Sequence, residues 1–267
     1  MNHKILCSDL DGTLLSTKSD VSPFTISEIN RIRPTTKIIL VSARMPKSMR
    51  YIQKDLGIAH EPIICYNGAL VIDGEEEIHS AIIEAETLES LYELTKEHSI
   101  KLGLYYKDEW FVEENSERVN KEINNTKTDP VYQKNSETIK DWKNRKVGAH
   151  KIMLMGTFET IERIQPKLLS LYSNKLNIYR SNDTLIEVSP KSVSKLSAIE
   201  LLIKDMHSLN DIIAFGDNYN DAEMLQQVNC GVAMGNARDE VKNIADHTTL
   251  CNTQDGVASF LNQHFKI

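Results

Sequence analysis

The stretch Ile5–Thr13 reads Ile-Leu-Cys-Ser-Asp-Leu-Asp-Gly-Thr and places two carboxylates two residues apart, where an apolar run ends in a glycine turn. An apolar run this close to the start is typical of a central strand of a parallel sheet, and open α/β sheets bind ligands beyond the carboxyl ends of such strands. Asp9 and Asp11 would then lie at an active-site edge. Two close carboxylates repel each other unless a cation offsets the repulsion, and oxygen ligands suit Mg²⁺. The alternative is an Asp-Gly turn without chemistry.

Apolar strand-like runs alternate with helix-like segments on both sides of a long interruption. Before the interruption we expect a helix over Ile26–Ile32, a strand over Lys37–Val41, a helix from Pro46 to Leu56 and a strand over Pro62–Tyr66. After it we expect a helix over Lys195–Met206, a strand over Asp211–Phe215 and a helix over Asp221–Gln227. Such alternation predicts an α/β fold with a doubly wound parallel sheet.

The interruption has its own pattern of elements. The expected elements are helices over Thr87–His98 and Glu159–Tyr172, a hairpin of Lys101–Tyr106 with Trp110–Glu113, and strands over Lys151–Met155, Leu176–Arg180 and Thr184–Val188. Hairpins beside helices are typical of an α+β unit. We therefore predict a core of residues 1–82 and 188–267 and an inserted α+β domain of residues 83–187.

Composition narrows the class of protein and its partners. The chain has 267 residues, of which 40% are hydrophobic, which is ample for a packed core. The formal net charge of −7 argues against a nucleic-acid or anionic-membrane partner, since either needs a basic face. The four cysteines show no CxxC spacing, and neither a membrane-length apolar stretch nor a signal-peptide pattern is present. We expect a cytoplasmic protein that is monomeric or weakly homo-oligomeric.

A second acidic cluster, Gly216–Asp221, follows the strand expected over Asp211–Phe215 and reads Gly-Asp-Asn-Tyr-Asn-Asp. If that strand neighbours the first one, Asp217 faces Asp9 and can complete an oxygen cage for Mg²⁺. Asp221 can hold the loop by accepting hydrogen bonds from backbone amides. The alternative is a plain helix N-cap, because Asn and Asp are good caps.

Other polar residues lie where an anion could bind. Ser42, Ala43 and Arg44 occupy a turn between a strand and a helix, where unpaired amides and a hydroxyl can form a phosphate seat. Lys195 lies in the first turn of its helix, where the interaction of a cation with the helix dipole is unfavourable. This position therefore predicts an anionic neighbour such as phosphate or Asp9. The alternatives are a capping serine and a solvated surface lysine.

Asn67 and Gly68 also follow a predicted strand and could line the same site. An Asn-Gly turn explains them equally well.

In this order, Asp9-Leu-Asp-Gly-Thr13, Ser42, Lys195 and Gly216–Asp221 resemble the four motifs of the haloacid dehalogenase-like (HAD) hydrolase superfamily. The insertion and the approach Glu187–Lys195 are similar to the Cof-type branch of small-molecule phosphatases. This resemblance implies a Rossmann-like core with an α/β cap domain over the site. Ser42-Ala43-Arg44 departs from the family's usual Thr-Gly-Arg, although the hydroxyl is kept.

The chemistry that fits these residues is hydrolysis of a phosphate ester through a phospho-aspartate. Asp9 would attack phosphorus, and Asp11 would protonate the leaving alkoxide and then activate water. The resemblance implies that Mg²⁺ binds side-chain oxygens of Asp9 and Asp217 and the backbone carbonyl of Asp11. Phosphate contacts are expected from Leu10, Ser42, Ala43, Lys195 and Asn220, with supporting roles for Asp221, Thr13, Arg44, Asn67 and Gly68.

Two other functions are compatible with the same residues. A phosphosugar mutase would return the phosphoryl group to its substrate, and a non-catalytic regulator would bind only Mg²⁺ or phosphate. The expected partner is a small phosphorylated metabolite, whose identity the sequence does not specify.

Overall fold

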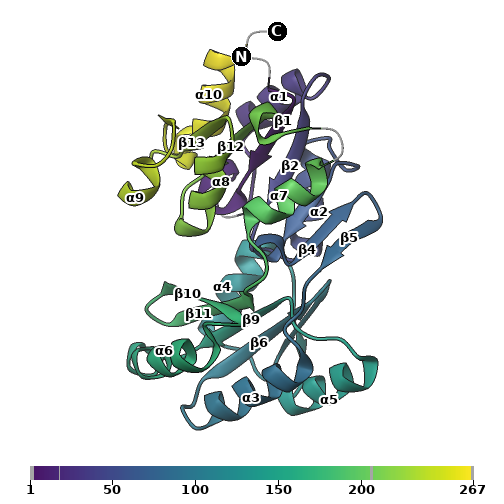
Figure 1. Ribbon diagram of the computed structural model, residues 1–267, viewed down its shortest axis with the longest axis vertical. Coiled ribbons are helices and arrows are strands. Elements are labelled where there is room, and N and C mark those ends of the chain that lie inside the picture. Colours follow the sequence, from purple (N-terminus) through teal and green to yellow (C-terminus); the bar gives the residue numbers. More distant parts are fainter. Residues whose placement is uncertain (1–2, 18, 205–206, 266–267) are drawn as a thin grey trace. The chain divides into compact units, whose positions relative to one another are not determined.

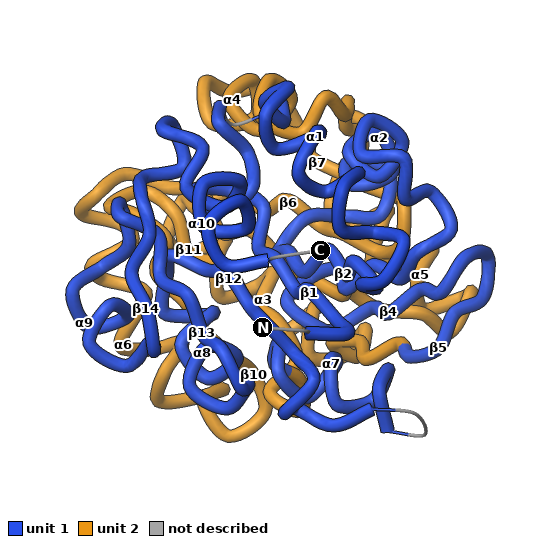
Figure 2. Tube along the Cα trace, turned by 90° about the horizontal axis from the view of Figure 1, so that it is seen from above, with its two compact units in different colours: residues 1–79, 194–267 blue, residues 80–193 orange. Residues whose placement is uncertain are grey.

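The computed structural model describes residues 3–17, 19–204 and 207–265 of the chain, which divides into two compact units. One unit combines residues 1–79 and 194–267, and the other is a single insertion of residues 80–193 (Figure 2). The α/β fold with an inserted α+β domain is therefore as expected, and the unit boundaries lie a few residues from the predicted domain boundaries.

The first unit is built on an eight-stranded sheet with the order β14-β13-β12-β1-β2-β3-β4-β5. Its strands are β1 (Ile5–Ser8), β2 (Lys37–Val41), β3 (Ile63–Cys65), β4 (Leu70–Asp73), β5 (Glu76–Ser80), β12 (Ile212–Gly216), β13 (Cys230–Ala233) and β14 (His247–Thr248). From β14 to β3 neighbouring strands are parallel, and β4 pairs with β3 antiparallel. Every residue of β1 and β12 is buried, as expected for central strands of a parallel sheet.

Six α-helices accompany this sheet within the described residues. They are α1 (Pro23–Ile32), α2 (Lys47–Asp55), α7 (Lys195–Ile203), α8 (Ala222–Gln227), α9 (Asp239–Lys242) and α10 (Gly256–His264). Helix α1 begins at Pro23, three residues before the predicted start at Ile26, because Ser22 Oγ accepts the N–H of Thr25 and Pro23 occupies the first turn. The helix predicted over Lys195–Met206 is observed as far as Ile203, and residues 205–206 lie outside the described residues.

The inserted unit contains a six-stranded sheet with the order β10-β11-β9-β6-β7-β8. Its strands are β6 (Lys101–Tyr106), β7 (Glu109–Val112), β8 (Val131–Tyr132), β9 (Lys151–Met155), β10 (Leu176–Asn182) and β11 (Leu185–Pro190), and its helices are α3 (Ala85–Lys96), α4 (Glu117–Thr126), α5 (Asn135–Arg145) and α6 (Phe158–Tyr172). The predicted hairpin of β6 and β7 is present. Figure 1 shows α3, α5 and α6 along one face of this sheet and α4 on the other.

The core of the inserted unit explains this arrangement. Leu88 of α3, Trp142 of α5 and Ile161 of α6 are fully buried in one cluster with apolar residues of the sheet. These three helices therefore bury their apolar faces against the same face of the sheet.

No helix among the described residues is both long and apolar enough to cross a membrane.

Candidate functional site

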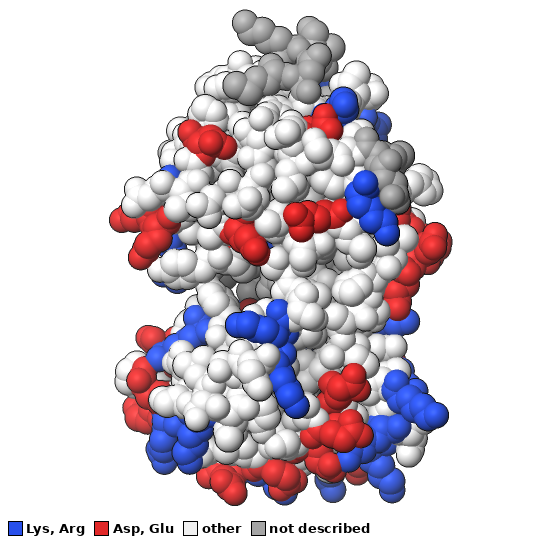
Figure 3. Space-filling view, in the orientation of Figure 1, with Lys and Arg blue, Asp and Glu red and all other residues white. Residues whose placement is uncertain are grey.

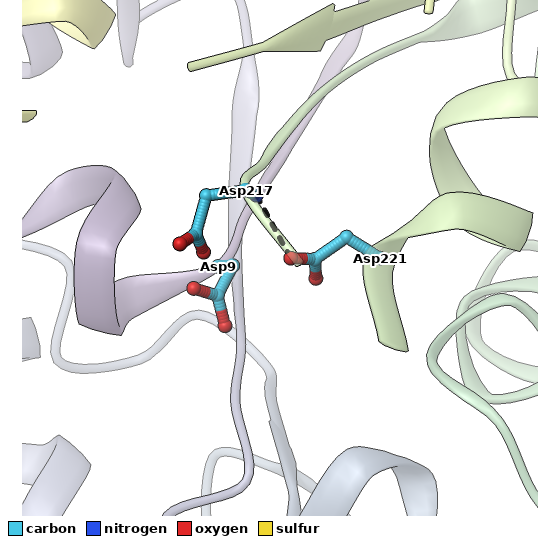
Figure 4. A group of neighbouring side chains, drawn as sticks. All are labelled: Asp9, Asp217 and Asp221. Atoms are coloured by element: carbon cyan, nitrogen blue, oxygen red, sulfur yellow. Dashed lines mark hydrogen bonds between the residues drawn. The ribbon is translucent and has the colours of Figure 1, made fainter. Parts of the chain in front are cut away.

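The two acidic clusters meet because their strands are neighbours. Strands β1 and β12 pair in parallel, with Ser8 opposite Phe215, and the N–H of Asp9 donates to the carbonyl of Phe215 at 3.0 Å. The carboxyl ends of both strands thus lie at one edge of the sheet. Carboxylate oxygens of Asp9, Asp217 and Asp221 all lie within 4.8 Å of one another (Figure 4). This is the juxtaposition that the sequence predicted for Asp9 and Asp217.

Lys195 is a buried part of this cluster. Its Nζ lies 2.6 Å from Asp9 Oδ1 and 2.6 Å from Asp221 Oδ1, and its side chain is only 1% exposed. Ser194 caps α7 and accepts the N–H of Ser197, so Lys195 is the first residue of the helix. The two carboxylates offset both the loss of hydration and the unfavourable helix dipole. The alternative of a solvated surface lysine is therefore wrong.

Asp221 holds the second acidic loop together. Its Oδ2 accepts the N–H groups of Asp217 at 2.9 Å and Asn218 at 3.0 Å, while its Oδ1 binds Lys195. The side chain of Asn218 in turn caps the short 3₁₀ turn Tyr219–Asp221. Both the loop-holding role and local capping are thus present. Because protein donors engage both oxygens of Asp221, Asp9 and Asp217 are better placed to offer oxygens to a ligand.

The electrostatics of the cluster favour a cation. Burial raises the pKa of Asp9 well above its usual range, and the charges of Asp221 and Asp217 add to this effect against the opposing charge of Lys195. Burial, followed by the charge of Asp221, raises the pKa of Asp217 to about 7. Three carboxylates thus face one ammonium group. A divalent cation bound to the carboxylate oxygens of Asp9 and Asp217 would remove this excess negative charge, so the donor set fits Mg²⁺.

Gly12 lets the first acidic loop pass close to Asp217. Its φ is +85°, and a Cβ at this position would lie 2.5 Å from Asp217 Oδ2. Thr13 follows and donates its hydroxyl hydrogen to Asp217 Oδ1 at 3.3 Å. The Asp-Gly turn therefore exists, and it brings the two acidic loops together. Leu10 is fully buried within the same loop.

The carboxylate of Asp11 is paired with Arg44 and is not one of the three clustered carboxylates. Arg44 donates from Nε to Asp11 Oδ2 and from Nη2 to Asp11 Oδ1, both at 2.8 Å. Arg44 is 4% exposed, and its Nη1 donates to Tyr51 Oη at 3.1 Å. The side chain of Asp11 is 44% exposed. A bidentate pair of this kind fixes the orientation of the carboxylate.

Hydrogen bonds join the predicted phosphate-seat residues to one another. The carbonyl of Ser42 accepts the N–H of Asn67 at 2.9 Å, and Asn220 Nδ2 donates to Asn67 Oδ1 at 3.0 Å. Ser42 is buried, and its Oγ accepts the N–H of Arg44 at 3.2 Å within the turn. The N-cap of α2 is Pro46, so the alternative that Ser42 caps this helix is wrong. Ala43, which stands between Ser42 and Arg44 in the sequence, is half-buried.

Gly68 helps to position Lys195. Its φ is +106°, and a Cβ there would lie 2.4 Å from the carbonyl oxygen of Ser194. Glycine therefore permits the first turn of α7 to approach the loop after β3. The positive φ of Asn67, 56°, shows that the turn suggested by the Asn-Gly sequence is also present.

The sequence motifs did not point to Asn236 and Asn252, which also bind the first acidic loop. Asn236 Nδ2 donates to the carbonyl of Gly12 at 2.8 Å, and Asn236 Oδ1 accepts the N–H of Asn252 at 2.9 Å. Asn252 Nδ2 donates to the carbonyl of Leu15 at 2.8 Å. These bonds tie the first acidic loop to the loops after β13 and β14. The sequence signal was Gly235-Asn236 just after an apolar run, at the carboxyl end of another parallel strand.

Comparison with known proteins decides the family. The sequence matches the model of the haloacid dehalogenase-like hydrolases over residues 6–261. The chain belongs to this family. The expectation drawn from the four HAD motifs is therefore confirmed.

Relatives and solved structures agree with this assignment over nearly the whole chain. A provisionally named phosphatase of Haemophilus influenzae is 32% identical, and the alignment covers 99% of each chain. The 5-amino-6-(5-phospho-D-ribitylamino)uracil phosphatase of Bacillus subtilis is 27% identical over 98% of each chain. A HAD-like hydrolase from Bacteroides thetaiotaomicron has a TM-score of 0.89 at 26% identity, covering 98% of this chain and all of that one. The prediction that this HAD-like protein is a hydrolase of the phosphatase class is confirmed.

Proposed function

We propose that this protein is a Mg²⁺-dependent phosphatase that hydrolyses small phosphorylated metabolites through a phospho-aspartate formed on Asp9. The observation that carries the proposal is the buried Asp9 carboxylate, held 2.6 Å from the Lys195 ammonium beside Asp217 at the carboxyl edge of the sheet. The phosphatase names of two relatives that cover nearly the whole chain support the same chemistry.

Asp9 is the proposed nucleophile. One carboxylate oxygen would form a bond to phosphorus as the ester oxygen leaves, and attack of water on phosphorus would then release inorganic phosphate and restore the carboxylate. The ammonium group of Lys195 binds Asp9 Oδ1 and so orients the proposed nucleophile. Its positive charge would also stabilise the phosphoryl oxygens. Ser42 and Asn220, with the backbone of Leu10 and Ala43, are the further proposed phosphate contacts.

Asp9 and Asp217, with the carbonyl of Asp11, are the proposed Mg²⁺ ligands. A bound Mg²⁺ would neutralise carboxylate and phosphoryl charge that Lys195 alone does not balance.

We expect phosphate release to require Mg²⁺. Purified protein treated with EDTA should release no phosphate from a panel of phosphorylated metabolites, and added Mg²⁺ should restore release. Mg²⁺ should also raise the melting temperature, because it would relieve repulsion among the three carboxylates. Activity that is unaffected by EDTA would contradict the metal assignment.

Asp11 is the proposed proton donor and acceptor. The paired Arg44 guanidinium holds its carboxylate in one orientation, from which it would protonate the leaving alkoxide and later deprotonate water.

The variant Asp11→Asn tests this role. It should lower turnover of alkyl phosphates by about 10²- to 10⁴-fold, the usual contribution of general acid-base catalysis. The loss should be much smaller for p-nitrophenyl phosphate, because its leaving group needs no proton. The matched control is Asp55→Asn on the exposed face of α2, which should leave both rates unchanged. Equal losses for the two substrate types would count against the assignment.

The inserted unit is the proposed cap that selects the substrate. The core motifs provide only groups that bind the phosphate end, so the organic part of the substrate needs other walls. The Bacillus subtilis relative acts on a phosphorylated ribitylamino compound, which supports a small phosphorylated metabolite as the substrate class here.

Exchange of residues 80–193 for the corresponding unit of a related phosphatase should change substrate preference. Mg²⁺ dependence and the requirement for Asp9 should be retained in the chimera, because both belong to the core. Preference that follows the core in such chimeras would contradict the cap proposal.

A cytoplasmic location and a monomeric or weakly oligomeric state stay predictions from the sequence.

A further inference from the structure

The inserted unit contains a cavity of about 600 Å³. Its walls come from the start of β6, the N-terminus of α4, the segment that joins β9 to α6 and the turn between β10 and β11. All of these residues belong to the inserted unit, and none belongs to the acidic cluster of the core. The volume is large enough for a small metabolite.

The cavity is cationic although the protein carries a net charge of −7. Lys101, Arg118 and Lys121 line it, against the single carboxylate of Glu117. Figure 3 shows Lys and Arg side chains gathered over the part of this unit where Figure 1 labels α4, β9 and β11. Clustered cations repel one another unless an anion lies among them, so this lining favours an anionic ligand.

Among the residues that the structure describes, two of these cations have no protein counter-ion. Lys101 pairs with Glu114 at 2.6 Å, whereas Arg118 and Lys121 form no ion pair within residues 3–17, 19–204 and 207–265. The Nε atom of Arg118 is buried and has no hydrogen-bond partner among these residues. A buried guanidinium N–H without an acceptor is costly, and an anionic ligand would supply the acceptor.

The N-terminus of α4 adds to the same preference. Ser116 Oγ accepts the N–H of Val119, the third residue of this ten-residue helix. The N–H groups of the first turn and the positive end of the helix dipole lie at the cavity wall that Ser116, Glu117 and Arg118 form. Phosphate groups bind well at such helix ends when side-chain cations accompany them.

The other polar groups of the lining suit hydroxyl groups of a ligand. Thr157, Thr184 and Asn182 line the cavity, and Asn182 Oδ1 accepts from both the N–H and the hydroxyl of Thr184. These bonds fix the amide so that its Nδ2 group can donate to a ligand. No aromatic side chain lies among the described residues that form the lining, so a nucleobase would find no stacking partner.

We propose that this cavity, which is formed wholly by residues of the inserted unit, binds a small, hydroxyl-rich phosphorylated metabolite such as a sugar phosphate. The phosphate lies against Arg118, Lys121 and the N-terminus of α4, and the hydroxyl groups lie toward Asn182 and the threonines. This proposal goes beyond the proposed phosphatase activity and does not require it.

Met155 lines the cavity and gives a site-specific probe. Full-length protein with ¹³C-labelled methionine methyl groups is titrated with ribose 5-phosphate in EDTA, and the Met155 signal is assigned with Met155→Leu. The Met155 signal should shift saturably. Inorganic phosphate should bind more weakly than ribose 5-phosphate, and neutral ribose should cause no saturable shift.

Variants connect the shift to the cations. Arg118→Gln should weaken binding roughly tenfold, and Lys121→Gln, whose side chain is exposed, should weaken it less. Lys140→Gln, an exposed lysine of α5 outside the lining, is the matched control and should bind like the parent. All three variants should have the same melting temperature as the parent protein.

The proposal fails if ribose 5-phosphate does not shift Met155, if neutral ribose binds equally well, or if Arg118→Gln and Lys121→Gln both bind like the parent. Its failure is distinguishable from failure of the proposed function. Phosphate release by the core is measured separately, with Mg²⁺, and should persist in Arg118→Gln and Lys121→Gln.

Discussion

Asp9→Asn should abolish phosphate release, with an expected loss of roughly 10³-fold or more for every substrate. The amide cannot attack phosphorus, so a better leaving group should not restore turnover, in contrast to the behaviour expected of Asp11→Asn. The measurement is single-turnover release of phosphate from both alkyl and p-nitrophenyl phosphates with Mg²⁺.

The stability of Asp9→Asn separates a chemical loss from a folding defect. Burial and neighbouring carboxylates raise the pKa of Asp9, so its charge is unfavourable in the metal-free folded protein. A neutral amide removes that charge, and the melting temperature in EDTA at pH 8 should not fall. Substantial turnover by the folded variant would show that another group is the nucleophile.

Lys195→Met should lower the free energy of unfolding by about 3–5 kcal/mol at pH 8 in EDTA. The ammonium group of Lys195 contacts both Asp9 and Asp221. Its removal leaves these two buried carboxylates without the cation that they share. Turnover should also fall by about 10²-fold or more, because the variant loses the positive charge that contacts Asp9, the proposed nucleophile. Urea unfolding and phosphate release measure the two effects.

The stability deficit of Lys195→Met should depend on pH. Lys195 lowers the pKa of Asp9, so the variant raises it further above the unfolded value of about 3.9. Between the unfolded and the folded pKa of Asp9, the folded variant binds more protons than the unfolded chain. The stability of the variant therefore falls as the pH rises from one pKa to the other. The deficit should therefore be smaller at pH 5.5 than at pH 8. The control Lys54→Met on α2 should change stability by less than about 0.5 kcal/mol at either pH. A deficit that grows at low pH would contradict the buried-charge account.

Local sequence patterns predicted the part of the site that depends on strand ends. Ile5–Cys7 and Ile212–Phe215 are continuously apolar and each lies just before an acidic loop, so a parallel sheet alone brings Asp9 near Asp217. The anionic neighbour that the sequence predicted for Lys195 is also present, as Asp9. These predictions succeeded because burial on both faces of a central strand leaves a clear hydrophobic signal.

The remaining features depend on long-range contacts that leave no periodic signal. The partner of the Asp11 carboxylate, Arg44, lies 33 residues away, and Asn236 reaches Gly12 across 224 residues. The edge strand β5 has the sequence Glu-Glu-Ile-His-Ser and is mostly exposed, so its apolar pattern is too weak to predict a strand. Two-residue strands such as β14 are too short for any periodicity.

The most direct test of the phosphatase account is to locate the covalent phosphoryl group. Asp11→Asn is mixed with p-nitrophenyl phosphate and Mg²⁺, quenched in acid within the first turnover, and mapped by peptide mass spectrometry. We predict one phosphoryl group, carried by Asp9 and absent when Asp9→Asn is added to the same variant. A phosphoryl group on any other residue, or a burst of p-nitrophenol with no covalent phosphoryl group, would contradict the account.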